Sequence, residues 1–98
     1  MDIRFTLNGV TFVWDEQKAQ TNARKHPGVY FEQAAEVFFD PFFRMVDASR
    51  NDEARDAVIG YDTQGRLLFV VHIEIEGETI RLISARKATQ EDRQTYDS

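Results

Sequence analysis

The stretch RLLFVVHIEIEGETIRLISA, residues 66–85, holds two apolar runs on either side of Glu76-Gly77. Each run is long enough for a β-strand, and a glycine-containing pair between two such runs is typical of a hairpin turn. The segment before it ends in Asp62-Thr63-Gln64-Gly65, which is rich in turn formers. The sequence therefore predicts a three-stranded antiparallel meander, with strands at residues 55–61, 66–75 and 78–85.

Turn length decides which side chains of this meander share a face, because side chains alternate along a strand. A two-residue turn at Glu76-Gly77 puts His72 opposite Arg81. The other face is then apolar and is formed by Phe69, Val71, Ile73, Ile80 and Leu82. We prefer this register because it gives the cleaner apolar face.

A four-residue loop at residues 62–65 extends the same register to the next strand. It pairs Ile59 with Leu68 and Ala57 with Val70, and it brings Arg55 opposite His72. The sequence then predicts a row of Arg55, His72 and Arg81 across three strands. A slip of one residue in either turn, such as a glycine bulge at Gly65, would break the row.

The N-terminal part of the chain carries further local signals. Asn8-Gly9 separates two alternating runs, residues 3–7 and 10–14, and predicts a tight hairpin. Asp15 suits a helix N-cap, and the helical spacing after it ends at His26. A second short helix is expected from the spacing of Phe31, Ala34, Ala35 and Phe38.

The remaining elements follow from breakers and caps. Asp40-Pro41 ends the second helix, a strand is expected at residues 42–46, and a polar loop at residues 47–53. Thr89 with Asp92 predicts the capped start of a last helix. The 98 residues form one domain of the α+β class, in which an antiparallel sheet carries helices on one face.

Composition limits the functions that this chain can have. Seventeen acidic residues against twelve Lys and Arg give a net charge of -5 and a pI near 4.9. This charge disfavours unaided coating of nucleic acid, whereas catalysis on a phosphate needs only a local cluster of cations. Without cysteine, a signal segment or a long apolar run, a cytoplasmic protein with no membrane contact is expected.

Several short motifs, taken in order, resemble one family. They are Phe12-Val13-Trp14-Asp15, Asn22 with Lys25-His26, Phe31 with Ala34, Asp40-Pro41, Ile59-Gly60 and Ile83-Ser84-Ala85-Arg86. Together they resemble the BrnT family of toxins, over about residues 12–96. The most specific parts are the Trp-Asp start, the Lys-His helix end and the Ser-Ala-Arg strand end.

The resemblance implies a type II toxin with a RelE-like fold that acts as a metal-independent ribonuclease and needs no cofactor. It also implies neutralisation by a BrnA-like antitoxin of the ribbon-helix-helix kind. Operator DNA would be reached only indirectly, through that antitoxin. No metal site is expected from the residues themselves, because the two histidines and the scattered carboxylates lack ligand spacing.

The Lys-His helix end supplies the first catalytic candidates. Metal-free RNA cleavage needs a base for the 2′-hydroxyl, an acid for the leaving 5′-oxygen and cations for the extra charge on phosphorus. His26 at a helix C-terminus suits the acid, because the helix dipole favours its protonated form. The alternative is a histidine that only caps carbonyl groups. We expect Lys25 to contact phosphate.

The meander supplies the other candidates. His72, between Arg55 and Arg81, would suit the general base; the alternative is a half-buried structural histidine. Arg81 and Arg86 would stabilise the transition state, unless they pair with nearby glutamates. Arg86 has the parity of the apolar face, so it reaches the site only if the strand ends or bulges near Ala85. Lys87 is a further phosphate contact.

A final group of residues points to a partner. Phe42, Phe43 and Met45 are more apolar than an exposed edge strand tolerates, so we expect an antitoxin segment to cover them. A second function remains open at this point. The chain could be a non-catalytic module that binds a DNA-binding partner, since an acidic surface complements a basic protein.

Overall fold

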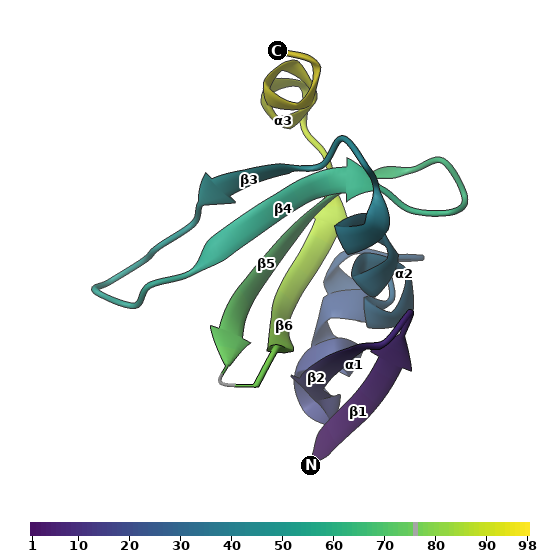
Figure 1. Ribbon diagram of the computed structural model, residues 1–98, viewed down its shortest axis with the longest axis vertical. Helices are drawn as coiled ribbons and strands as arrows, with labels where there is room; N and C mark the ends of the chain where they lie inside the picture. The colour runs from purple at the N-terminus through teal and green to yellow at the C-terminus, as the bar shows by residue number, and fades with distance from the viewer. Residues whose placement is uncertain (76) are drawn as a thin grey trace.

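A six-stranded sheet forms the centre of the molecule, with strand order β1-β2-β6-β5-β4-β3 (Figure 1). The computed structural model describes residues 1–75 and 77–98. The strands are β1 (Asp2–Leu7), β2 (Val10–Asp15), β3 (Arg44–Asp47), β4 (Asp56–Tyr61), β5 (Leu67–Ile75) and β6 (Thr79–Lys87). The helices are α1 (Glu16–Lys25), α2 (Phe31–Glu36) with the 3-10 turn η1 (Val37–Phe39), and α3 (Gln90–Asp97). None of the described helices is long and apolar enough to cross a membrane.

The α+β prediction is confirmed, with one refinement of the sheet. β1 and β2 form the expected hairpin, in which Asn8 and Gly9 both have positive φ, 50° and 80°. The meander of β4, β5 and β6 is antiparallel as expected. β2 and β6 run parallel, however, so the sheet is mixed. This pairing joins distant segments and leaves no local sequence signal.

Helix ends lie where the capping residues predict them. Asp15 accepts a hydrogen bond from the backbone N–H of Lys18 at 3.0 Å, and α1 ends at its C-cap, His26. Thr89 and Asp92 form the reciprocal capping box of α3. These local predictions are confirmed because each depends on contacts within one turn of helix.

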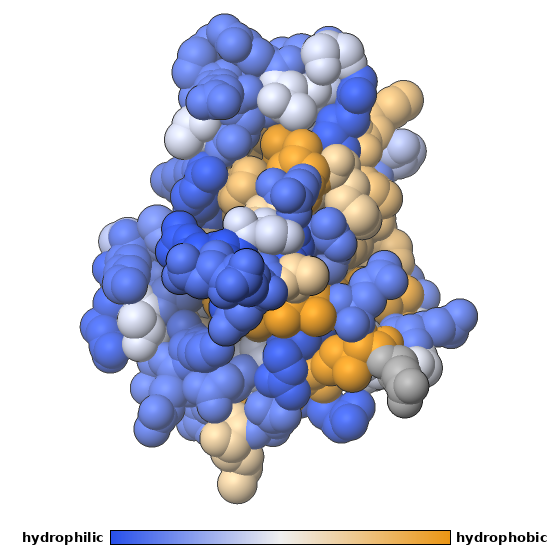
Figure 2. Space-filling model, turned by 90° about the vertical axis from the view of Figure 1, so that its left-hand side faces the viewer, coloured by the Kyte–Doolittle hydropathy of each residue, from blue (hydrophilic) through white to orange (hydrophobic). Residues whose placement is uncertain are grey.

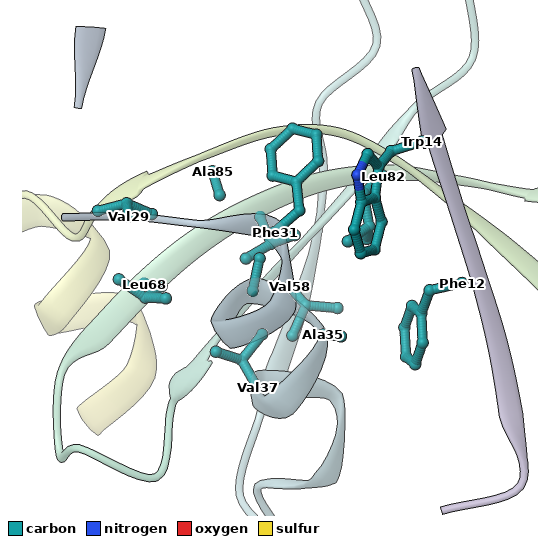
Figure 3. Packing of buried hydrophobic residues seen from close by; sticks show 12 residues of the cluster. Phe12, Trp14, Val29, Phe31, Ala35, Val37, Val58, Leu68, Leu82 and Ala85 are labelled. Carbon is teal, nitrogen blue, oxygen red and sulfur yellow. The ribbon is translucent and has the colours of Figure 1, made fainter. Parts of the chain in front are cut away.

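The main core lies between α2 and one face of the sheet (Figure 3). Figure 3 shows Phe31 of α2 beside Trp14 of β2, and their rings meet edge to face with centroids 5.6 Å apart. Other buried members are Phe12, Val29, Ala34, Ala35, Val37, Val58, Leu68, Val70, Leu82 and Ala85. α2 covers this face, α1 lies beside the free edge of β6, and α3 lies at the far end of the sheet (Figure 1). We call the opposite side the open face.

The register of the meander differs from the prediction by one residue at each turn. Tyr61 pairs with Leu67, because Gly65 adopts positive φ and bonds back to Asp62 as a bulged three-residue turn. Ile75 pairs with Thr79, so three residues separate β5 from β6 instead of two. Of the expected Glu76-Gly77 turn, Glu76 lies outside the described residues.

The two slips exchange the faces of β5. Leu68, Val70 and His72 point into the core, whereas Phe69, Val71 and Ile73 lie half-buried on the open face. The predicted row of Arg55, His72 and Arg81 is therefore wrong. His72 pairs with Leu82 rather than with Arg81, and Asp56 rather than Arg55 lies opposite it.

Candidate functional site

The C-terminal half of β6 lies against α1 instead of a strand. β2 pairs with β6 only as far as Arg81, so the backbone of β6 beyond that point needs other partners. Asn22 of α1 provides them: its side-chain oxygen accepts from Ala85 N–H at 3.0 Å, and its Nδ2 donates to Ala85 O at 2.9 Å. The buried amide thus replaces a strand neighbour and fixes the end of α1 beside the end of β6.

This contact brings four predicted site residues together around one hollow. Lys25 and His26 end α1, and Arg86 and Lys87 end β6. We call the hollow the α1–β6 cavity; it has a volume of about 260 Å³ and is lined by Lys25, His26, Pro27, Val29, Arg86 and Lys87. Three permanent cations and an imidazole on one small surface suit an anionic ligand.

Arg86 reaches this position because β6 bulges. The pairing shifts between Val71 opposite Ser84 and His72 opposite Leu82, so that Ile83 is the extra residue. The bulge turns Arg86 to the open face, where its guanidinium lies 4.1 Å from the centroid of the Phe69 ring. From the sequence, Arg86 could reach the site only if the strand ended or bulged near Ala85. The structure has such a bulge, at Ile83, two residues before Ala85.

Asp92 of α3 holds the Arg86 side chain. Its Oδ2 accepts from Arg86 Nη1 at 2.6 Å and from Thr89 N–H at 2.8 Å. Burial alone would raise the pKa of Asp92, but the hydrogen bonds from Thr89 and Arg86 outweigh it and hold that pKa below its usual value. The acid that caps α3 therefore also fixes the guanidinium between β6 and Phe69.

Arg81 lies on the same open face but not at the α1–β6 cavity. It forms a two-bonded pair with Asp2, with Nη2 at 2.7 Å from Oδ2 and Nη1 at 3.3 Å from Oδ1. The hydrogen bond from Arg81 lowers the pKa of Asp2, and the same bond raises the pKa of Arg81. The pairing that the sequence left open involves an aspartate of β1 rather than the glutamates near the turn.

His72 is another predicted catalytic residue that the structure places outside this cavity. It is 1% exposed, its ring meets Phe38 edge to face at 4.9 Å, and its Nδ1 lies 3.5 Å from Val70 O. Burial lowers the pKa of His72. The sequence had suggested that Arg55 and Arg81 would lower this pKa as neighbours. A buried histidine facing α2 and η1 cannot reach a substrate on the open face.

Arg55 lies on the open face, at a second hollow. Its Nη2 pairs with Glu53 Oε2 at 2.6 Å. We call this hollow the loop cavity; it measures about 370 Å³ and is lined by Ala48, Ser49, Arg50, Arg55, Phe69, Val71, Ser84 and Arg86. Arg86 thus borders both hollows. Within the described part of the chain, no group of three or more His, Asp or Glu could hold a metal ion.

The predicted partner residues are exposed at the start of the edge strand: Met45 lies on β3, and Phe42 and Phe43 directly precede it. β3 is the last strand of the sheet, and Phe42, Phe43 and Met45 are 75%, 38% and 50% exposed. Figure 2 views the molecule from the side toward which the β3–β4 loop points, and hydrophobic patches there alternate with hydrophilic side chains. Large apolar side chains on an unpaired edge strand are typical of a contact surface.

Comparison with known proteins identifies the family of the chain. A profile of the family described as ribonuclease toxin, BrnT, of type II toxin-antitoxin systems matches residues 14–92. The chain belongs to the BrnT family. The crystal structure of the Brucella abortus ribonuclease toxin BrnT superposes with a TM-score of 0.60 at 28% identity, covering 79% of this chain and 94% of that one. Among curated proteins, none matches by sequence.

The BrnT family is described as ribonuclease toxins of type II toxin-antitoxin systems, and membership of such a family implies an antitoxin partner. Both borders of the α1–β6 cavity lie inside the matched segment. Four residues that lie beside the predicted site residues were not predicted to belong to the site: Arg50, Phe69, Ser84 and Asp92. The signal for Asp92 was its capping position six residues after Arg86. The signal for Phe69 and Ser84 was their parity with Arg86 once the bulge is counted.

Proposed function

We propose that this chain is a metal-independent endoribonuclease of the cytoplasm and that it cleaves RNA at the α1–β6 cavity. One observation carries the proposal: Lys25 and His26 from α1 meet Arg86 and Lys87 from β6 around a single hollow. These side chains supply proton transfer and charge stabilisation, which are the needs of RNA cleavage by the 2′-hydroxyl. The family supports the substrate class, since its members are described as ribonuclease toxins.

The roles follow from exposure and anchoring. The 2′-oxygen attacks phosphorus, the bond to the 5′-oxygen breaks, and His26 donates a proton to the leaving oxygen. Arg86, fixed by Asp92, faces the charge that develops on the non-bridging oxygens, because a planar guanidinium binds two oxygens at once. Lys25 and Lys87 hold the phosphate. The 2′-hydroxyl proton passes to water, since the second histidine, His72, is buried.

Cleavage of a labelled RNA by the purified chain in excess chelator tests this proposal. The unchanged protein should cleave, and His26→Ala should lose about 100-fold or more in rate, as is usual for loss of a general acid. A matched control is Arg24→Ala, which removes an exposed cation two residues before His26 and outside the lining of the cavity. Activity that disappears with chelator, or that His26→Ala leaves intact, would refute the assignment.

The antitoxin is part of the same proposal. We infer that a BrnA-like ribbon-helix-helix partner covers the β3 edge at Phe42, Phe43 and Met45, and that operator DNA is reached only through it. Support comes from the exposure of these side chains and from the net charge of -5, which favours a basic partner. The double variant Phe42→Asp/Met45→Asp should no longer co-purify with the antitoxin that is encoded beside this chain. Undiminished co-purification would exclude this surface.

A non-catalytic module is the second candidate, because the β3 edge is a contact surface whether or not the chain cleaves RNA. On this alternative, the chain only joins a DNA-binding partner and contributes to repression. The two candidates separate on growth and RNA integrity when the chain is expressed alone. Intact RNA and normal growth would favour the interaction module.

A further inference from the structure

The loop cavity lies beside the proposed cleavage site and has a different lining. It lies between the β3–β4 loop and the open face of β5 and β6. Its volume of about 370 Å³ is within the range of small-ligand sites. Arg50, Arg55 and Arg86 contribute three guanidinium groups, and among the described residues that line it none is acidic. This composition suits a phosphate group.

The rest of the lining suits a nucleoside. Phe69 and Val71 form an apolar surface on β5, and Ser84 adds a hydroxyl group to the lining. Aromatic rings and guanidinium planes stack on nucleobases of any sequence, and hydroxyl groups bond to base edges or ribose. An acidic peptide would use the arginines but would gain little from the Phe69 and Val71 surface.

Hydrogen bonds fix the backbone of the β3–β4 loop before any ligand binds. Arg50 and Glu53 exchange two backbone hydrogen bonds, of 3.1 and 2.9 Å, which close the loop. Ser49 Oγ accepts from Arg55 N–H at 3.2 Å and donates to Asp47 Oδ1 at 2.6 Å. A loop fixed in this way loses less entropy on binding.

One polar atom of Arg55, a residue that lines this cavity, has no partner among the described residues. Arg55 Nε is buried, and no acceptor among the described residues bonds to it, whereas Arg55 Nη2 pairs with Glu53. A buried N–H of a charged group without an acceptor is costly, and native proteins rarely leave one. The side chain of Arg55 as a whole is 25% exposed, so a bound phosphate can contact the accessible part of this cation.

We propose that the loop cavity is a binding subsite for the nucleotide next to the cleaved phosphate. Its phosphate lies on Arg55 and Arg50 and its base against Phe69. The subsite deepens the proposed function and depends on it for the position of cleavage. Arg86 and Ser84 connect the two parts, since Arg86 also borders the α1–β6 cavity. The RNA strand therefore crosses the open face from the end of α1 toward the β3–β4 loop.

Substrate length tests the subsite directly. A dinucleoside monophosphate has no second phosphate for Arg55, whereas a hexanucleotide does. Arg55→Ala should lose about tenfold in kcat/KM on the hexanucleotide, through KM, because a charged hydrogen bond is removed. It should lose nothing on the dinucleoside monophosphate. An equal loss on both substrates, or none on either, would overturn the subsite.

Two further variants distinguish the loss of a phosphate contact at Arg55 from a change in the structure of the loop. Glu53→Gln breaks the same ion pair but keeps Arg55, so its KM should stay within about twofold of the unchanged protein. If Glu53→Gln raises KM as much as Arg55→Ala does, the effect comes from the loop and the subsite fails. If Arg55→Ala does not fold, the same comparison of the two substrates is made with Arg50→Ala, because the side chain of Arg50 is exposed.

A binding measurement separates failure of the subsite from failure of the proposed function. A fluorescent 2′-O-methyl hexanucleotide cannot be cleaved, so its anisotropy reports Kd alone. Arg55→Ala should weaken Kd about tenfold even if the unchanged chain cleaves no RNA. Unchanged Kd in a chain that does cleave RNA would reject the subsite only. Weaker binding of the antitoxin with unchanged Kd for RNA would assign the cavity to a protein partner instead.

Discussion

The two ends of β6 carry the same kind of side chain in different surroundings. At one end Arg81 pairs with exposed Asp2 and borders neither cavity. At the other end Arg86 is held by Asp92, lies over Phe69 and borders both the α1–β6 cavity and the loop cavity. Both arginines have a carboxylate partner, so pairing alone does not distinguish them. The difference is that α1 brings Lys25 and His26 to only one end of the strand.

Alanine at each arginine gives the largest expected contrast. Arg86→Ala should lower RNA cleavage about 100-fold or more, because it removes a fixed cation next to the reacting phosphate. Arg81→Ala should stay within about twofold, since its exposed pair with Asp2 contributes little. Initial rates on the same labelled RNA measure both. Comparable losses at the two ends would remove the distinction between them.

Asp92→Asn tests whether Arg86 must be held as well as present. The amide keeps an oxygen for Thr89 but loses the charge that binds Arg86, so cleavage should fall about tenfold. Arg86 would then act like a free surface cation. An Asp92→Asn protein with full activity would show that the anchor is only part of the α3 cap.

Acid unfolding provides a second measure of the same anchor. The pKa of Asp92 is lowered in the folded chain, so its contribution to the free energy of unfolding is complete above the unfolded pKa of about 4. That contribution is lost as the pH falls through the lowered folded value. Thermal melts between pH 6 and 3 should therefore show a smaller acid loss in Asp92→Asn than in the unchanged chain. Parallel curves would contradict this.

His72 extends the comparison to stability. Burial lowers the pKa of His72, so the unfolded chain takes up its proton first and stability falls as the pH drops below about 6.5. His72→Leu should reduce this fall in melts between pH 7.5 and 5, with cleavage within about twofold at pH 7.5. A large loss of cleavage in a stable His72→Leu protein would restore His72 as a catalytic residue.

The smallest effect is expected at Asp2. Asp2→Asn releases Arg81 from its pair without adding Lys25 or His26 to that end of the strand. Anisotropy with the 2′-O-methyl hexanucleotide should show Kd within about twofold of the unchanged protein. Markedly tighter binding would mean that Asp2 alone keeps RNA away from Arg81. The two ends of β6 would then differ because Asp2 neutralises Arg81, and not because α1 lies at the other end.

Much of the fold could be predicted because its signals are local. Asn8-Gly9, the Asp15 cap and the Thr89–Asp92 box each depend on contacts within a few residues, and each is confirmed. The register could not be predicted, because the glycines at 65 and 77 each suit turns that differ in length by one residue. Glu78 adopts a φ of 64°, which is rare for a residue with a side chain and gives no sequence signal.

The candidate site was predicted in part for the same reason. Lys25-His26 and Arg86-Lys87 stand out in the sequence as pairs of possible phosphate ligands beside helix and strand ends. That they meet depends on Asn22 bonding to Ala85 and on the parallel pairing of β2 with β6, both of which join distant segments. One slipped residue was enough to place His72 in the core and Phe69 on the open face.

A double-mutant cycle between His26 and Arg86 tests the central claim most directly. If α1 and β6 build one metal-free site, either single alanine variant disables it, and the double variant should cleave RNA in chelator about as slowly as the worse single variant. Residues that act as a unit are strongly non-additive in this way. Rate losses that simply multiply in the double variant would show that His26 and Arg86 act independently, and would contradict a shared site.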